Sequence, residues 1–143
     1  MFYQILPEIY TLAVPKTTLT ATLLAMEQVA EQTHRLRLLA PPFAQDAHAG
    51  HFVNVLIPQA GNLLWRRPFS IHQVDRSKGT IDLLLASVGK GSQALSRLNT
   101  GAQLDLLGLL GNTFTYPDDL QEAIIVAGGV GIAPFLLMMQ DLQ

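Results

Sequence analysis

The amino-acid sequence predicts a mainly β fold, an antiparallel barrel or sandwich, followed by the beginning of a nucleotide-binding βαβ unit. Three observations support this fold class. Residues 19–88 offer short strand-like runs separated by turns, Gly89 opens a short helix, and residues 123–127 form a continuous apolar run before a glycine-rich turn. With 143 residues, the chain has the size of one ordinary domain.

Five strand-like runs precede the short helix. They cover Leu19–Val29, Thr33–Leu39, His51–Ile57, Phe69–Val74 and Thr80–Val88. In the second run, polar and mainly apolar positions alternate with a period of two, as in a strand with one buried face. Pro41 and Pro42 end this run, and a polar turn at residues 75–79 joins the last two runs.

The short helix and a sixth strand complete the pattern. Ser92 can cap a helix that carries apolar residues at helical spacing, and Asn99–Gly101 ends it. Strand character returns over Gln103–Leu107. Further on, the apolar run Ala123–Ala127 predicts a buried parallel strand that leads into the turn Gly128–Pro134 and an apolar helix, as in the first part of a βαβ unit.

Composition and charge argue against several classes of partner. The formal net charge is −2, and no basic run interleaves with aromatic residues, so nucleic acid is not an expected partner. The apolar stretches are much shorter than the ~20 residues needed to cross a bilayer. The N-terminal stretch lacks the basic start of a signal peptide. We therefore expect a cytoplasmic protein that does not enter a membrane.

The lack of cysteine limits the chemistry of this chain further. It excludes disulfides, thiolate nucleophiles and cysteine-held zinc or iron–sulfur sites. His48 and His51 are three residues apart, but they flank Gly50 in a loop without a nearby carboxylate cluster. A loop pair of this kind is more often solvated than metal-bound, so we expect no metal site.

The strongest clue to function is the segment Arg67-Pro68-Phe69-Ser70, at the entry to a strand. An arginine there can grip a diphosphate as a planar fork, and the Ser70 hydroxyl, two strand positions from Pro68, points into the same pocket. The alternative is that Arg66 and Arg67 form a solvated pair and that Ser70 is an ordinary strand residue. Taken alone, the segment fits both interpretations.

A second clue is the segment Gly89-Lys90-Gly91-Ser92, which opens the short helix. Backbone N–H groups at a helix start, with glycines that permit close approach, form an anion site. The alternative is a plain strand-to-helix turn with Ser92 as its cap. Because one strand separates this segment from Arg67–Ser70, we expect both segments to bind the same phosphate-bearing ligand.

These segments resemble the ferredoxin–NADP reductase-like flavoproteins, whose flavin domain carries an Arg-x-x-Ser/Thr motif followed by a Gly-x-Gly/Ser/Thr helix start. The resemblance covers residues 19–135. The stretches Leu63–Ile71, Val88–Ser92 and Leu106–Asn112 are most similar to the electron-transfer subunits of NAD-linked, B-type dihydroorotate dehydrogenases. The resemblance implies a six-stranded antiparallel Greek-key barrel that binds FAD, with one short helix, followed by the first strand and helix of a truncated Rossmann-like nucleotide domain.

The resemblance also implies a set of cofactor-binding residues. They are Arg67, Pro68, Phe69, Ser70, Leu84, Leu85, Ala86, Gly91, Ser92, Gly129 and Gly131. Arg67 would pair with the FAD diphosphate, Pro68 and Phe69 would shape the flavin and ribose contact, and Ser70 would hydrogen-bond the isoalloxazine edge. Residues 84–86 would act largely through their backbone. No side chain would be catalytic, because the flavin itself performs the hydride and electron chemistry.

The implied organisation has three parts: an N-terminal extension over residues 1–18, the FAD barrel over residues 19–115, and the start of an incomplete NAD-binding domain over residues 116–143. NAD(H) and a [2Fe–2S] cluster are expected only in a full-length relative. We expect an oxidoreductase component that has little activity alone. The extension is rich in apolar residues and could pack on the barrel or on a second chain.

The implied function is an electron relay between NAD and a partner dehydrogenase that oxidises dihydroorotate in pyrimidine biosynthesis. The expected partner is that catalytic subunit or a second copy of this chain. Two alternatives stay open at the level of the sequence. One is another ferredoxin reductase-like flavin or NAD(P)H oxidoreductase, and the other is a binding barrel without a cofactor.

Overall fold

The computed structural model describes residues 17–57 and 66–143. Its elements are β1 (Thr17–Ala30), β2 (Thr33–Leu39), α1 (Pro41–Asp46), β3 (Phe52–Leu56), β4 (Arg67–Asp75), β5 (Thr80–Ala86), α2 (Lys90–Leu95), β6 (Gln103–Leu110), the 3₁₀ turn η1 (Gly129–Ile132) and α3 (Ala133–Asp141). Most of the expected N-terminal extension, and residues Leu63–Trp65 of the flavin motif, lie outside the described residues.

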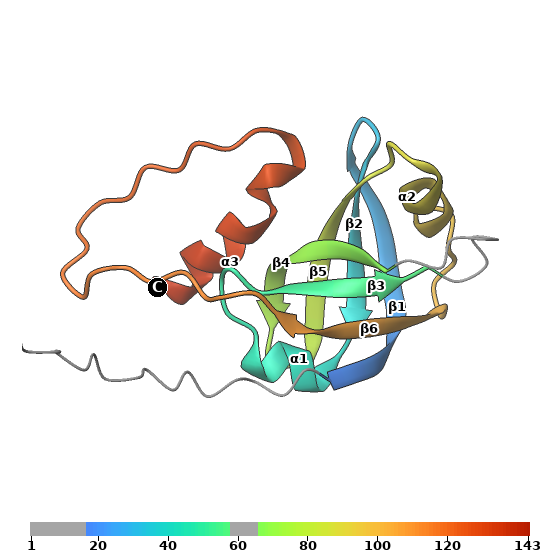
Figure 1. Cartoon of the computed structure of the whole chain (residues 1–143), viewed down its shortest axis with the longest axis horizontal. Coiled ribbons are helices and arrows are strands. Elements are labelled where there is room, and N and C mark those ends of the chain that lie inside the picture. The colour runs from blue at the N-terminus through green and yellow to red at the C-terminus, as the bar shows by residue number, and fades with distance from the viewer. Residues whose placement is uncertain (1–16, 58–65) are drawn as a thin grey trace, which may run out of the picture.

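The six strands of the described residues close into an antiparallel barrel in the order β1-β2-β5-β4-β3-β6 (Figure 1). Strands β3, β4 and β5 are sequential neighbours, whereas β6 returns to lie between β3 and β1, which is a Greek-key connection. Strand β1 is long enough to close the barrel, because its residue Thr22 pairs with Leu39 on β2 and with Gln103 on β6. The predicted six-stranded Greek-key barrel is confirmed.

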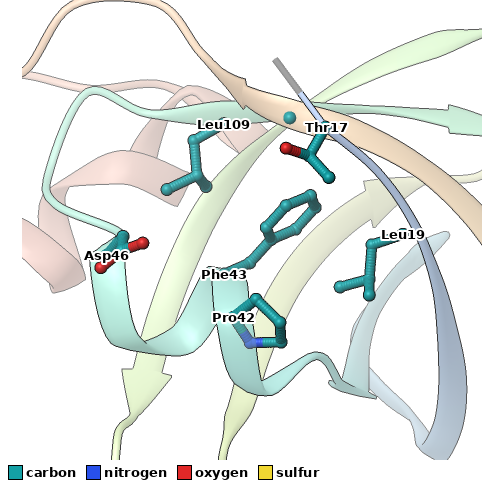
Figure 2. Close-up of a pocket in the computed structure, with 7 residues that line it drawn as sticks. Thr17, Leu19, Pro42, Phe43, Asp46 and Leu109 are labelled. Atoms are coloured by element: carbon teal, nitrogen blue, oxygen red, sulfur yellow. The ribbon is translucent and has the colours of Figure 1, made fainter. Parts of the chain in front are cut away.

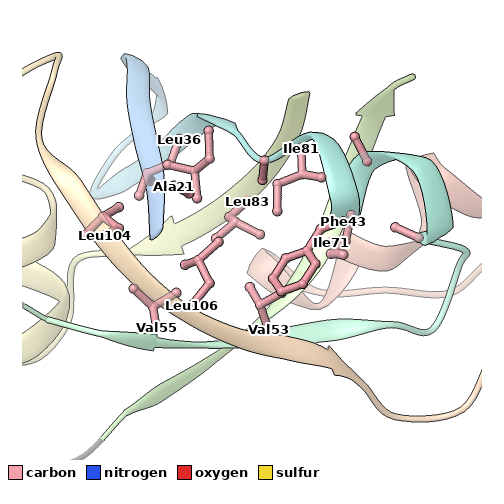
Figure 3. Packing of buried hydrophobic residues seen from close by; sticks show 14 of the residues in the cluster. Ala21, Leu36, Phe43, Val53, Val55, Ile71, Ile81, Leu83, Leu104 and Leu106 are labelled. Atoms are coloured by element: carbon pink, nitrogen blue, oxygen red, sulfur yellow. The ribbon is translucent and has the colours of Figure 1, made fainter. Parts of the chain in front are cut away.

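The barrel interior is filled by aliphatic side chains from alternate strand positions (Figure 3). On β2, Leu36 and Leu38 are completely buried, as their alternation with polar neighbours predicts. Leu83 and Leu85 on β5 are buried in the same way. Helix α1 lies at one end of the barrel, where its residue Phe43 is only 4% exposed and joins the core.

The structure contains a short helix, α1, that the sequence analysis does not predict. Pro41 and Pro42 end β2 as expected, but they also occupy the first turn of α1. Proline is well suited to that position, since its missing N–H would have no partner there and its φ is already helical. The two prolines therefore end one element and begin the next.

The strand predicted over Ala123–Ala127 is not formed, which is a correction to the sequence analysis. Residues 121–128 have no regular secondary structure, and Ile124 and Val126 are 87% and 90% exposed. A parallel strand is held by hydrogen bonds to neighbouring strands, and no strand of the described residues pairs with this run. The run forms part of the open connection between β6 and α3 (Figure 1).

The helix predicted after the glycine-rich turn is present as α3. It lies against the outside of β4 (Figure 1). Leu137 is completely buried and Ala133 is 4% exposed, so the apolar side of the helix faces the barrel. The ring of Phe135 lies 6.0 Å from the ring of Phe114, in the segment that follows β6. The final helix is thus packed on the barrel.

Candidate functional site

Arg67–Ser70 and Gly89–Ser92 lie at the same end of two neighbouring strands. Because β4 and β5 are antiparallel, the start of β4 and the end of β5 lie at the same end of the barrel. Their ladder runs from Asp75↔Thr80 to Ile71↔Leu83 and is not continued beyond that pair. Arg67–Ser70 instead pairs with β3, and Leu84–Ala86 pairs with β2. Beyond Ile71↔Leu83, β4 and β5 therefore no longer pair with each other, and the edges that face each other there are not part of the ladder.

The segment Arg67–Ser70 forms the first four residues of β4. Phe69 packs partly against the core, Pro68 is exposed, and Arg67 and Ser70 are half-buried. The Arg67 guanidinium also donates a long hydrogen bond, 3.4 Å, to the carbonyl of Arg66. The strand therefore fixes the backbone of the whole motif, while Pro68 and Ser70 share its outward face.

Arg66 and Arg67 do not form a solvated pair. The Arg66 guanidinium lies 2.8 Å from Asp105 Oδ2 and donates a second bond of 3.1 Å to the Asp105 carbonyl. These bonds connect the start of β4 to β6, so the Arg66 guanidinium is already bonded within the barrel. The alternative interpretation of these two arginines is wrong for Arg66.

Side chains on Leu84–Ala86 alternate in the usual way of a strand. Leu85 is completely buried in the core, whereas Leu84 and Ala86 are half-buried on the outer side. Leu85 cannot present its side chain to a ligand on the outside of the barrel, so only its backbone could do so.

The segment Gly89–Ser92 turns the chain from β5 into α2, but its cap differs from the prediction. Gly89 is the N-cap, and Ser92 lies in the first turn with its Oγ accepting a hydrogen bond from the Gly89 N–H at 3.0 Å. The first intrahelical bond runs from the Gln93 N–H to the Gly89 carbonyl at 2.8 Å. The N–H groups of Lys90–Ser92 precede that bond, and a helix start leaves such groups to other acceptors.

The glycine-rich turn before α3 is exposed and lies beside β5. Gly129 has a φ of +53°, which favours glycine. A Cβ added to Gly129 or Gly131 would meet no atom within 4 Å. These two glycines are therefore not required for packing against the described residues, and the space beside their backbone is open.

These donor groups fit a ligand that carries a diphosphate. Arg67 offers a guanidinium, Ser70 a hydroxyl, and the first turn of α2 offers backbone N–H groups, all of which suit phosphate oxygens. A Cβ at Gly89 would also meet no atom within 4 Å, so a phosphate could approach this backbone closely.

A pocket of about 210 Å³ opens elsewhere on the barrel, beside α1 (Figure 2). Its lining residues are Thr17, Leu19, Pro42, Phe43, Asp46, Gly108 and Leu109. None of the expected cofactor-binding residues lines it. Among the described residues, no group of three or more histidine, cysteine, aspartate or glutamate side chains could hold a metal ion. None of the helices in the same ranges has the length and apolar character of a membrane span.

The sequence analysis missed a polar cluster where the end of α3 meets the barrel. Asp141 Oδ2 accepts a hydrogen bond from the Ala49 N–H at 2.9 Å and lies 3.6 Å from His48 Nδ1. Arg76 lies 4.0 Å from the same carboxylate. The sequence contains no short spacing that would reveal this cluster, since 92 residues separate Ala49 from Asp141.

His51 belongs to the same region and is buried, not solvated as expected. Only 7% of it is exposed, and its Nδ1 accepts a hydrogen bond from the His48 N–H at 3.1 Å. Burial lowers the pKa of His51 below its usual 6.5, and the charge of His48 lowers it further, whereas Asp141 opposes the change. The surroundings of His51 therefore disfavour its charged form.

We expect acid to destabilise the fold through His51. The unfolded chain takes up the His51 proton near pH 6.5, but the folded chain resists it. The contribution of His51 to the free energy of unfolding is therefore fully present above that pH. It falls as the pH drops toward the lower pKa of the folded state. Urea denaturation at about pH 7.5 and about pH 5.5 measures the loss. The variant His51→Asn can still accept the His48 N–H but does not titrate, so an equal loss in that variant would contradict the assignment.

Comparison with known proteins places this geometry in a family. Residues 20–116 match the family model described as the oxidoreductase FAD-binding domain. A dihydroorotate dehydrogenase B (NAD(+)) electron transfer subunit from Desulforamulus reducens is 39% identical over 122 residues, which is 85% of this chain and 47% of that protein. Its counterpart from Enterococcus faecalis is 37% identical over 124 residues, with the same coverage. The chain thus spans about half the length of these relatives.

A solved structure supports the fold assignment. The ferredoxin reductase of carbazole 1,9a-dioxygenase superposes with a TM-score of 0.74 over 90% of this chain and 39% of that one, at 19% identity. The resemblance at that level of identity concerns the fold alone. Together with the family match over residues 20–116, the geometry shows that the chain belongs to the family of oxidoreductase FAD-binding domains.

Proposed function

We propose that the chain holds FAD and relays electrons between NAD and a dehydrogenase subunit that oxidises dihydroorotate. The observation that carries this proposal is the segment Arg67–Ser70, fixed at the open end of the β4–β5 ladder within a FAD-binding family match. The named relatives, at 37–39% identity, support the choice of dihydroorotate and NAD. The chain covers about half of each relative, so this activity is proposed for the protein of which these residues form part.

The residues at the end of the ladder would bind and orient the cofactor. Arg67 would pair with the diphosphate as a bidentate fork, and the N–H groups at Gly91 and Ser92 would complete the grip. Pro68 and Phe69 would shape the ring and ribose contact, and Ser70 would hydrogen-bond the edge of the isoalloxazine ring. When bound, FAD supplies the hydride and single-electron chemistry.

Residues Leu84–Ala86 would meet the cofactor through their backbone, because the Leu85 side chain is committed to the core. Gly129 and Gly131 would contact the nicotinamide nucleotide, since the space beside both is open. We further propose the division into an extension over residues 1–18, a barrel over residues 19–115, and a nucleotide-domain segment over residues 116–143. The proposed location is the cytoplasm, and the proposed partner is a catalytic dehydrogenase subunit or a second copy of the chain.

An absorbance spectrum of the purified chain, supplied with FAD and then freed of unbound cofactor, tests the proposal directly. Bound oxidised flavin absorbs near about 450 nm, and the apoprotein does not. The expected result is retained absorbance that bleaches when dihydroorotate and a catalytic dehydrogenase subunit are added without oxygen. Retained flavin that dihydroorotate does not reduce, but that passes electrons to oxidised ferredoxin after chemical reduction with dithionite, would favour a different ferredoxin reductase-like enzyme. A colourless protein would favour a binding barrel without a cofactor.

A further inference from the structure

Helix α3 is fixed to the barrel near both of its ends. Near its C-terminus, Gln140 exchanges two hydrogen bonds of 3.3 Å with the backbone of Val74, one to the N–H and one to the carbonyl. Asp141 accepts the Ala49 N–H at 2.9 Å. Between the ends, Leu137 is completely buried. These contacts hold the helix along β4.

At the start of the helix, a histidine on β4 contributes a hydrogen bond. His72 Nδ1 lies 2.8 Å from the Ala133 carbonyl oxygen. A carbonyl oxygen can only accept, so Nδ1 carries the proton in this bond. Ala133 directly follows the turn Gly129–Ile132, and the Ala133 N–H in turn donates to the Val130 carbonyl. The bond from His72 therefore anchors the residue at which the turn ends.

The strand is locally irregular at His72. The β4–β5 register passes from Ile71↔Leu83 to Gln73↔Asp82, so one extra residue is present on β4. A β-bulge of this kind leaves the extra residue unpaired and disrupts the ladder locally. Ile71 is completely buried, and both Ser70 and His72 lie on the opposite, outer side of it. His72 therefore lies on the side of β4 that faces α3, at a bulge two residues from Ser70.

We infer that His72 is a positioning residue that sets the place of the Gly129–Ile132 turn beside the flavin-binding end of β4. This inference rests on the proposed function, because the turn is the segment proposed to contact the nicotinamide nucleotide. One bond from His72 connects that turn to the strand that carries Arg67 and Ser70. The place of the turn relative to Arg67 and Ser70 then depends on this bond.

The test compares two substitutions at His72 in the full 143-residue chain. His72→Phe keeps an aromatic ring but removes the donor, whereas His72→Asn places an N–H donor close to the position of Nδ1. We measure hydrogen exchange of the Gly131 and Ala133 amides, which donate to the Gly128 and Val130 carbonyls. We expect His72→Phe to speed their exchange about five- to tenfold, and His72→Asn to restore the wild-type rate within about twofold.

The variant Gln140→Ala is the matched control. It loosens the C-terminal end of α3, so exchange should rise at Leu142, whose N–H donates to the Met138 carbonyl at 3.1 Å, and not at Gly131. Unchanged exchange at Gly131 and Ala133 in His72→Phe would overturn the inference. Equal acceleration in the Phe and Asn variants would overturn it as well, because a lost ring and not a lost donor would then be responsible.

Flavin reduction provides the functional half of the test. In the longer protein of which these residues form part, with FAD bound and oxygen excluded, we expect NADH to reduce the His72→Phe variant about five- to tenfold more slowly than the wild type, with rescue by His72→Asn. FAD affinity should change by less than about twofold. Hydrogen exchange is measured without cofactor, so it tests the positioning role of His72 even if the wild type binds no FAD. Failure of the wild type to bind FAD would overturn only the proposed function.

Discussion

Replacing Arg67 by alanine is expected to weaken FAD binding by roughly 1.5–3 kcal/mol, about a 10- to 150-fold rise in Kd. This is the loss that follows when a charge-assisted hydrogen bond to a diphosphate is removed. Arg67→Lys should recover only part of the affinity, because an ammonium group cannot form the bidentate fork of a guanidinium. Titration calorimetry with FAD measures the affinity of all three proteins.

The neighbouring Arg66 is the natural control for this experiment. Its guanidinium is bonded to Asp105 across the barrel wall, so Arg66→Ala should lower the stability of the fold. The FAD affinity of the folded Arg66→Ala protein should stay close to that of the wild type. If both alanine variants bind FAD as tightly as the wild type, the diphosphate is held elsewhere and the assignment of Arg67 is wrong.

Much of the barrel could be predicted from the sequence because its strands are short and antiparallel. Strand β2 has the bounds predicted for it, Thr33–Leu39, since strict alternation and the two following prolines mark both its face and its end. The additional length of β1 and β6 escaped prediction. The extra residues at the start of β1 pair with β6, as Thr17 does with Gly108, and Leu110 pairs with Phe52 on β3, so they depend on contacts between distant parts of the chain.

The apolar run Ala123–Ala127 shows the limit of local patterns. Its composition is that of a buried parallel strand, yet strand formation depends on a neighbour that supplies hydrogen bonds, and none of the described strands lies beside it. The glycine-rich turn and helix after it were predicted correctly, because turn and helix signals are local.

The candidate site could also be predicted only in part. The segments Arg67–Ser70 and Gly89–Ser92 could be found in the sequence because each has its own residue pattern. The contacts that arrange them could not. The parting of β4 from β5 beyond Ile71↔Leu83, and the bond from His72 to Ala133, depend on register and on packing between residues 61 positions apart.

The loop that anchors α3 contains a glycine whose replacement is expected to be among the most destabilising in the chain. Gly50 has a φ of +97°, and an added Cβ would lie 2.4 Å from the Asn112 carbonyl oxygen and 3.0 Å from the Phe114 nitrogen. These are backbone atoms, so neither can rotate away as a side chain could. The flanking residue Ala49 accepts the Phe114 N–H and donates to Asp141, and both bonds would shift with the loop.

We therefore expect Gly50→Ala to lower the free energy of unfolding by about 3–5 kcal/mol, the sum of an unfavourable φ and a backbone clash. Gly101→Ala is the matched control, because Gly101 has a φ of +92° but an added Cβ would meet no atom within 4 Å. The Gly101→Ala variant should lose only the free energy of unfolding that the unfavourable φ costs, about 1–2 kcal/mol. Urea denaturation followed by tryptophan fluorescence or circular dichroism measures both values. Equal losses in the two variants would show that the loop moves to accommodate the methyl group, and the close approach of Gly50 to Asn112 would then not be required for the fold.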